Sequence, residues 1–171
     1  FKQHSQPRVE LRPNKFTWLG STKPLDAFKY FFRETPAGIV LAHVYQYEAD
    51  RSTWVIEMSE QTWRNLGLDR LGEQEMLPVL EQVFAEELEG HPLIANRSLW
   101  RNFPNITNKT WVRDNAVLVG DAKATAHFSI GSGTKLAMED AIALFEAFPK
   151  HQDVNKALSV DGTPRRGEVE K

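Results

Sequence analysis

The sequence predicts an α+β fold in which an antiparallel sheet with packed helices is followed by a strand–turn–helix segment. Three observations support this class. Aromatic and apolar residues alternate over short runs in the first sixty positions, which is typical of strands. Apolar residues recur at helical spacing between positions 72 and 88. A short apolar run at 116–119 leads into Gly120-Asp121 and then into a second helical stretch.

Four strands are expected in the first part of the chain, at residues 14–19, 27–33, 38–47 and 52–58. The last two are expected to form a hairpin through residues 48–51. Period-two alternation places one set of side chains on one face of the third strand: Ile39, Leu41, His43, Tyr45 and Tyr47. It places Trp54, Ile56 and Met58 together on the fourth strand.

Helices are expected to follow the sheet. Ser59 is a candidate N-cap for a helix that passes Leu66, and residues 72–88 predict a longer helix that ends before Gly90-His91-Pro92. The acidic residues Glu86, Glu87 and Glu89 are interpreted as a solvated helix face. Residues 98–103 and 110–112 are expected to be extended.

Composition excludes several classes of function. The 171 residues fit one ordinary domain, and a net charge of −2 gives no electrostatic footprint for nucleic acid or for an anionic membrane. The chain has no cysteine, which excludes disulfides and thiolate chemistry and suits a reducing compartment such as the cytoplasm. Its five histidines are scattered, so no metal site is expected. No signal peptide or membrane helix is apparent, and the start at Phe1 indicates a fragment of a longer protein.

The main candidate ligand-binding residues lie after position 116. Gly120-Asp121 is followed by a loop with His127 and Phe128, a Gly131-Ser132-Gly133 turn and a helix expected at 134–148. A helix that opens on glycines can receive a phosphate, a carboxylate or the electron-rich edge of a planar cofactor. The G-x-G-x-x-G fingerprint fails because its third glycine is Leu136, and the phosphate-loop pattern fails because Lys135 follows Thr134.

Two further expectations concern the helix at 134–148. Glu139 and Asp140 are expected in its first turns, where acidic side chains suit the positive end of the helix dipole. Its apolar side is expected to consist of Leu136, Ala137, Ala141, Leu144, Phe145 and Phe148.

The stretch NAVLVGDAKATAHFSIGSGTKLAMEDAIAL resembles the second flavin-binding motif of the class A flavoprotein aromatic monooxygenases. Its centre, AHFSIGSGTKLAMEDA, is most similar to the branch that hydroxylates aromatic acyl-CoA thioesters such as 2-aminobenzoyl-CoA or salicylyl-CoA. A related branch acts on tryptophan-derived pigment precursors. The resemblance covers roughly residues 14–150, and it implies an FAD-dependent hydroxylase that uses O₂ and NAD(P)H.

The resemblance also implies roles for single residues. Asp121 matches the aspartate that hydrogen-bonds a hydroxyl of FAD, Gly131 and Gly133 allow the chain to approach the isoalloxazine ring, and the N–H groups of Thr134 and Lys135 match those that face its pyrimidine side. His127 is the candidate catalytic residue. Substrate contacts are expected from Phe128 and from His43 or Tyr45 on the sheet.

Some positions depart from the family pattern. Lys123 and Ala124 stand where the general pattern has Ala-His, Phe128 takes the place of a proline, and residues 161–164 interrupt a region that is usually helical. The amino-terminal βαβ unit with its glycine fingerprint is absent from this sequence. The chain is therefore expected to need a missing amino-terminal FAD-binding portion of the same protein, and to bind FAD weakly on its own.

The expected organisation is a lead-in at 1–13, a substrate-side sheet with helices at 14–113, a flavin-binding segment at 114–150 and a loose tail at 151–171. Two alternatives remain open at this point. The chain could be a non-catalytic α+β binding module, or part of a hydroxylase of tryptophan-derived substrates. The sequence does not distinguish NADH from NADPH, identify the exact substrate or give the oligomeric state.

Overall fold

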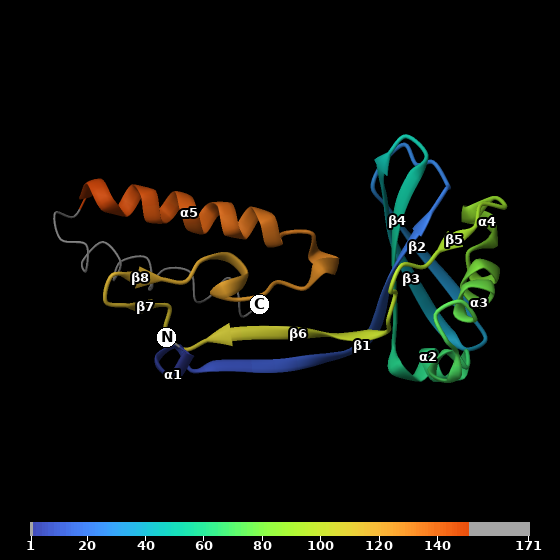
Figure 1. The fold of residues 1–171 in the computed structure, drawn as a ribbon, viewed down its shortest axis with the longest axis horizontal. Helices are drawn as coiled ribbons and strands as arrows, with labels where there is room; N and C mark the ends of the chain where they lie inside the picture. Colours follow the sequence, from blue (N-terminus) through green and yellow to red (C-terminus); the bar gives the residue numbers. More distant parts are fainter. Residues whose placement is uncertain (1, 151–171) are drawn as a thin grey trace. The chain divides into compact units, whose positions relative to one another are not determined.

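The computed structural model describes residues 2–150, which divide into two compact units (Figure 1). One unit comprises residues 13–103, and the other joins residues up to 12 to those from 104 onward. Strands β1 (Pro7–Ser21) and β6 (Arg101–Asn108) contribute residues to both units. β1 begins inside the expected lead-in, where a short helix α1 (Lys2–Ser5) precedes it. The expected tail at 151–171, with the interruption at 161–164, lies outside the described residues.

The unit of residues 13–103 is built on an antiparallel sheet, as the sequence predicts. Its strand order is β2-β3-β4-β1-β5, with β6 paired to β1, where β2 is Lys29–Thr35, β3 is Gly38–Glu48, β4 is Arg51–Met58 and β5 is Leu93–Ile94. β3 and β4 form the predicted hairpin, and β2 pairs with β3 in the same antiparallel sense. The short strand β5 was not anticipated, because two residues carry no periodicity.

Helices cover one face of this sheet and define its core. Trp54, Ile56 and Met58 lie opposite the fully buried residues Val44, Ala42 and Val40 of β3, so all six side chains point to the same face. Leu80, Phe84 and Leu88 of the helices complete the hydrophobic cluster. The aromatic side of β3, which includes His43 and Tyr45, therefore lies on the opposite face of the sheet.

Local chemistry sets the helix boundaries. Helix α2 (Glu60–Asn65) starts at the predicted N-cap, because the Oγ of Ser59 accepts a hydrogen bond from the N–H of Thr62 at 3.1 Å. A 3₁₀ turn, η1 (Leu68–Arg70), follows it. The predicted helix at 72–88 is shorter and broken: α3 (Met76–Val83) and α4 (Ala85–Leu88) are separated at Phe84, whose φ of −109° is not helical.

The unit that includes residues 104–150 contains the predicted strand–turn–helix. A small sheet of β7 (Val112–Arg113) and β8 (Ala116–Val117) leads to the 3₁₀ turns η2 (Gly120–Ala122) and η3 (Phe128–Ile130), and then to helix α5 (Gly133–Lys150). The expected strand at 116–119 is therefore only two residues long. The fold class is confirmed, with the flavin-motif segment in the predicted order.

The apolar side expected for α5 is only partly correct. Asp140 and Ala147 are the buried residues of the helix, whereas Phe145 is 76% and Phe148 is 44% exposed. Periodicity identifies an apolar stripe but not what covers it, and within this unit α5 packs against η2. Among the described residues, no helix is both long enough and apolar enough to cross a membrane.

Candidate functional site

The Gly120-Asp121 turn has a backbone that requires glycine. Gly120 has a φ of +56°, and a Cβ atom placed on it would lie 3.1 Å from the Cβ of Ala137 in α5. Any side chain at position 120 would therefore be strained and would press on the helix. Asp121 follows immediately in η2 with an exposed side chain, so its carboxylate is available as a hydrogen-bond acceptor.

The glycine turn before α5 leaves the start of that helix open. Gly131 has a φ of +66°, and a Cβ atom built at Gly131 or Gly133 would meet no atom of the described chain within 4 Å. Thr134 and Lys135 are exposed in the first turn, which is where a helix has N–H groups without intrahelical acceptors. This end of α5 therefore has room for an anion or for the electron-rich edge of a planar group.

His127 and Phe128 stack on each other in the loop between the two turns, with ring centroids 4.4 Å apart and an interplanar angle of 29°. The N–H of Ser129 donates a hydrogen bond to Nδ1 of His127 at 3.3 Å. Nδ1 also lies 2.6 Å from Oγ of Ser129, so Ser129 contacts the ring through both its N–H and its hydroxyl.

His43 and Tyr45 lie on β3, on the sheet face away from the helices. His43 is 3% exposed, its ring meets the ring of Tyr30 edge to face at 4.8 Å, and its Nε2 lies 3.5 Å from Oε2 of Glu57. Tyr45 is half-buried and stacks on Phe28 with centroids 5.7 Å apart. Of these two candidates, Tyr45 is the more accessible to a substrate.

Glu57 was missed by the sequence reasoning. It is 7% exposed on the same face as His43, and its Oε1 accepts a hydrogen bond from Nδ2 of Asn14 at 2.8 Å. A charged residue that interrupts the apolar run at 52–58 was the available signal, because a buried carboxylate needs polar partners.

The same sheet face carries large apolar side chains that are 43–67% exposed. They are Trp18, Tyr30, Phe32 and Ile39, which the strand register aligns with His43 and its neighbours. An exposed cluster of this kind is characteristic of a surface that contacts a ligand or another part of a protein.

The predicted site residues therefore fall into two groups. Asp121, the glycine turn and the His127 loop belong to the unit that includes residues 104–150, whereas His43 and Tyr45 belong to the unit of residues 13–103.

The dipole interpretation of Glu139 and Asp140 is wrong. The first turn of α5 contains no acidic residue. Glu139 forms an ion pair with Lys135 at 2.8 Å, and Asp140 is buried, with its Oδ2 accepting a hydrogen bond from the N–H of Gly120 at 3.1 Å. Asp140 thus connects α5 to the Gly120-Asp121 turn, through a residue 20 positions away in the sequence.

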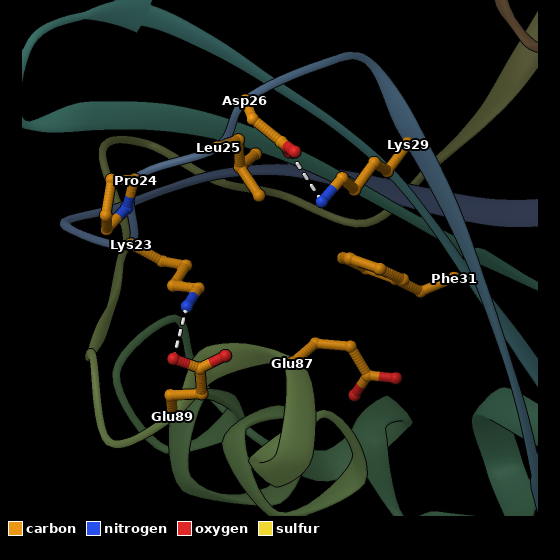
Figure 2. Close-up of a pocket in the computed structure, with 8 residues that line it drawn as sticks. All are labelled: Lys23, Pro24, Leu25, Asp26, Lys29, Phe31, Glu87 and Glu89. Atoms are coloured by element: carbon orange, nitrogen blue, oxygen red, sulfur yellow. Dashed lines mark ion pairs between the residues drawn. The ribbon is translucent and has the colours of Figure 1, made fainter.

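A pocket of about 620 Å³ lies in the unit of residues 13–103, between the start of β2 and α4 (Figure 2). Its charged side chains are already paired: Lys23 with Glu89 at 2.7 Å and Lys29 with Asp26 at 2.6 Å. Glu87, on its wall, pairs with Arg33, so the acidic run is not simply a solvated helix face. Each of these charged side chains therefore has an opposite charge beside it.

Two of these ion pairs predict how a carboxyl group titrates. The hydrogen bond from Lys23 holds the pKa of Glu89 below its usual range, as Lys29 does for the pKa of Asp26. Lys23→Gln is therefore expected to raise the pKa of Glu89 and to leave that of Asp26 nearly unchanged, and Lys29→Gln is expected to act chiefly on Asp26. Carboxyl NMR titration measures both.

The lowered pKa of Glu89 determines how the stability of the fold changes with pH. The Lys23–Glu89 pair stabilises the fold above the ordinary glutamate pKa, and this contribution is lost as the pH falls through the lowered value. An unchanged pKa of Glu89 in the Lys23→Gln variant would contradict the Lys23–Glu89 ion pair.

Among the described residues, no group of three or more His, Cys, Asp or Glu side chains could hold a metal ion.

Comparison with known proteins places the chain among monooxygenases. Salicyloyl-CoA 5-hydroxylase from a Streptomyces species is 36% identical over 174 residues, which cover 96% of this chain and 34% of that enzyme. A 3-hydroxy-4-methyl-anthranilyl-(aryl-carrier protein) 5-monooxygenase from Streptosporangium sibiricum is 39% identical over 91% of this chain and 40% of its own length. Protodeoxyviolaceinate monooxygenase from Chromobacterium violaceum is 34% identical over 92% and 43%. No protein-family model matches the sequence.

Solved structures show the same fold. A probable FAD-dependent monooxygenase from Pseudomonas aeruginosa matches 95% of this chain and 46% of its own with a TM-score of 0.65 and 17% identity. The tetrameric form of 2-methyl-3-hydroxypyridine-5-carboxylic acid oxygenase matches 96% and 45% with a TM-score of 0.66 and 16% identity. The chain spans 34–43% of the length of the three curated relatives. Over 91–96% of its length, the chain is therefore homologous to part of three monooxygenases, and it shares the fold of the corresponding part of FAD-dependent monooxygenase structures.

Proposed function

We propose that this chain is the substrate-side sheet and second flavin-binding segment of an FAD-dependent monooxygenase that hydroxylates an aromatic ring carried as a thioester. The observation that carries the proposal is its identity of 36% and 39% to two enzymes whose names specify a CoA or carrier-protein substrate. The open glycine turn and the exposed Asp121 support it independently, because both suit a flavin cofactor. The absence of cysteine supports a cytoplasmic location.

The residues of the turn and of α5 would hold the flavin half of FAD. Asp121 would accept a hydrogen bond from a hydroxyl of the cofactor, and the glycines at 131 and 133 would let the chain approach the ring. The N–H groups of Thr134 and Lys135, together with the positive end of the helix dipole, would stabilise negative charge at the ring edge. When bound there and reduced by NAD(P)H, FAD would supply the activation of O₂.

Each unit is proposed to carry its own candidate substrate contacts. His127 would hydrogen-bond a ring substituent or the thioester carbonyl, and Phe128, stacked on it, would contact the aromatic ring. On the sheet, Tyr45 is the more exposed candidate for contact with an aromatic group, whereas His43 is buried and its ring meets that of Tyr30. Aromatic contacts of this kind add about 0.5–1.5 kcal/mol beyond area burial.

The proposed function predicts a substrate preference. In the full-length protein that contains this chain, 2-aminobenzoyl-CoA or salicylyl-CoA is expected to stimulate NAD(P)H oxidation and to be hydroxylated. The free acids are expected to do so weakly, because they lack the carrier. Oxygen uptake and product analysis by mass spectrometry measure both effects.

A second candidate is oxygenation of a substrate that carries no thioester, such as a tryptophan-derived molecule. The 34% identity to protodeoxyviolaceinate monooxygenase favours it, since that name specifies no carrier. Turnover with a tryptophan-derived substrate but with neither thioester would replace the first candidate by the second. A full-length protein that binds no flavin and turns over neither class would leave the non-catalytic binding module instead.

A further inference from the structure

A buried ion pair ties the turn that carries Asp121 to helix α5. The ammonium of Lys123 lies 2.8 Å from Oδ1 of Asp140, and the two side chains are only 5% and 10% exposed. The second carboxylate oxygen, Oδ2, accepts the hydrogen bond from the N–H of Gly120. A single carboxylate on α5 therefore binds both ends of the turn formed by residues 120–123.

The surroundings of Lys123 compensate for the cost of burying its charge. Its Nζ lies 4.1 Å from the centroid of the Trp111 ring, on the face where an indole attracts a cation. The carboxylate of Asp140 supplies the opposite charge. A neutral side chain at position 123 would leave Asp140 as a buried charge without this counter-ion, which is strongly unfavourable.

The backbone around Asp121 is held from several directions. Nδ2 of Asn108 donates hydrogen bonds to the carbonyl oxygens of Ala122 and Lys123 at 3.0 and 2.8 Å, and the N–H of Lys123 donates to the carbonyl oxygen of Gly120 at 2.9 Å. The side chain of Asp121 itself is exposed. Its carboxylate is therefore presented on a fixed turn, and a ligand that binds it has no loop to order.

We propose that Lys123 is a positioning residue for the cofactor. As the counter-ion of Asp140, it fixes the 120–123 turn in the conformation in which Asp121 binds a hydroxyl of FAD. Lys123 acts through Asp140 and Gly120 and needs no contact with the cofactor. This inference rests on the proposed function, and it gives a role to a position at which the sequence departs from the general family pattern.

A double-mutant cycle in the full-length protein tests this role. Lys123→Met removes the charge, Asp121→Ala removes the acceptor, and the dissociation constant of FAD is measured by flavin fluorescence for each variant and for the pair. Lys123→Met alone is expected to weaken FAD binding about tenfold, but less than about twofold when Asp121 is already alanine, because residues that act together are not additive. Lys109→Met, at an exposed lysine of the same unit, is the matched control and should leave FAD binding unchanged.

The outcomes separate this inference from the function on which it rests. If the wild-type protein binds no FAD, the proposed function fails. If it binds FAD and the two substitutions weaken binding additively, or if Lys123→Met has no effect, only the positioning role fails. If Lys123→Met does not fold, the same cycle is run with Lys123→Gln, which removes the charge but keeps a side chain that can hydrogen-bond Asp140. A coupled loss of FAD affinity with that variant supports the role, and additive effects or no loss overturn it.

Discussion

Replacing Trp54 with alanine is expected to lower the free energy of unfolding by about 3–5 kcal/mol, the range for removing a buried tryptophan side chain. Trp54 is 0% exposed, and its ring lies 5.7 Å from that of Phe31 and 5.9 Å from that of Phe84. The substitution opens a cavity between the sheet and the helices. It also removes the hydrogen bond that Oγ of Ser52 accepts from the indole N–H of Trp54. Urea unfolding followed by circular dichroism measures the change.

Trp18→Ala is the matched control for this prediction. Trp18 is 50% exposed on the opposite face of the same sheet, so its loss should cost less than about 1 kcal/mol. Equal losses for the two tryptophans would show that both faces of the sheet are packed in the free chain. That result would contradict the assignment of the helix-covered face as the core.

Replacing Asp121 with alanine in the full-length protein is expected to weaken FAD binding about ten- to a hundredfold. A hydrogen bond to a charged acceptor is worth roughly 1.5–3 kcal/mol, which corresponds to that range of dissociation constants. Because the side chain is exposed, the melting temperature of the apoprotein should change little. Flavin fluorescence titration and thermal unfolding measure the two effects separately.

Two further variants make this prediction specific. Asp121→Asn keeps an acceptor oxygen without the charge and should lose less affinity than Asp121→Ala. Glu146→Ala removes an exposed acid from α5 and should leave the FAD dissociation constant as it is in the wild type. A folded Asp121→Ala variant with unchanged FAD affinity would refute the role assigned to Asp121.

Most local elements could be predicted because their signals lie within a few adjacent residues. The N-cap at Ser59 requires only a hydroxyl three residues before the N–H of Thr62, and the β3–β4 hairpin follows from two alternating runs separated by a short polar turn. The order of turn, glycine pair and helix after Gly120 was likewise apparent. The break at Phe84 was not, because apolar spacing continues through it: Leu80, Phe84 and Leu88 are all buried.

The sequence by itself determined the antiparallel sheet with its helices, the position of the turns between β8 and α5, and the glycines at 120 and 131 that these turns require. Only the tertiary structure decided which face of the sheet is the core, since both faces carry apolar side chains and alternation is the same for either. The tertiary structure alone also decided that His43 lies beside Glu57, and that Asp140 contacts Lys123 and Gly120. Such pairs are set by how strands register and helices pack, because a buried charge takes whichever partner the fold brings within a few ångströms, and no local pattern encodes that partner.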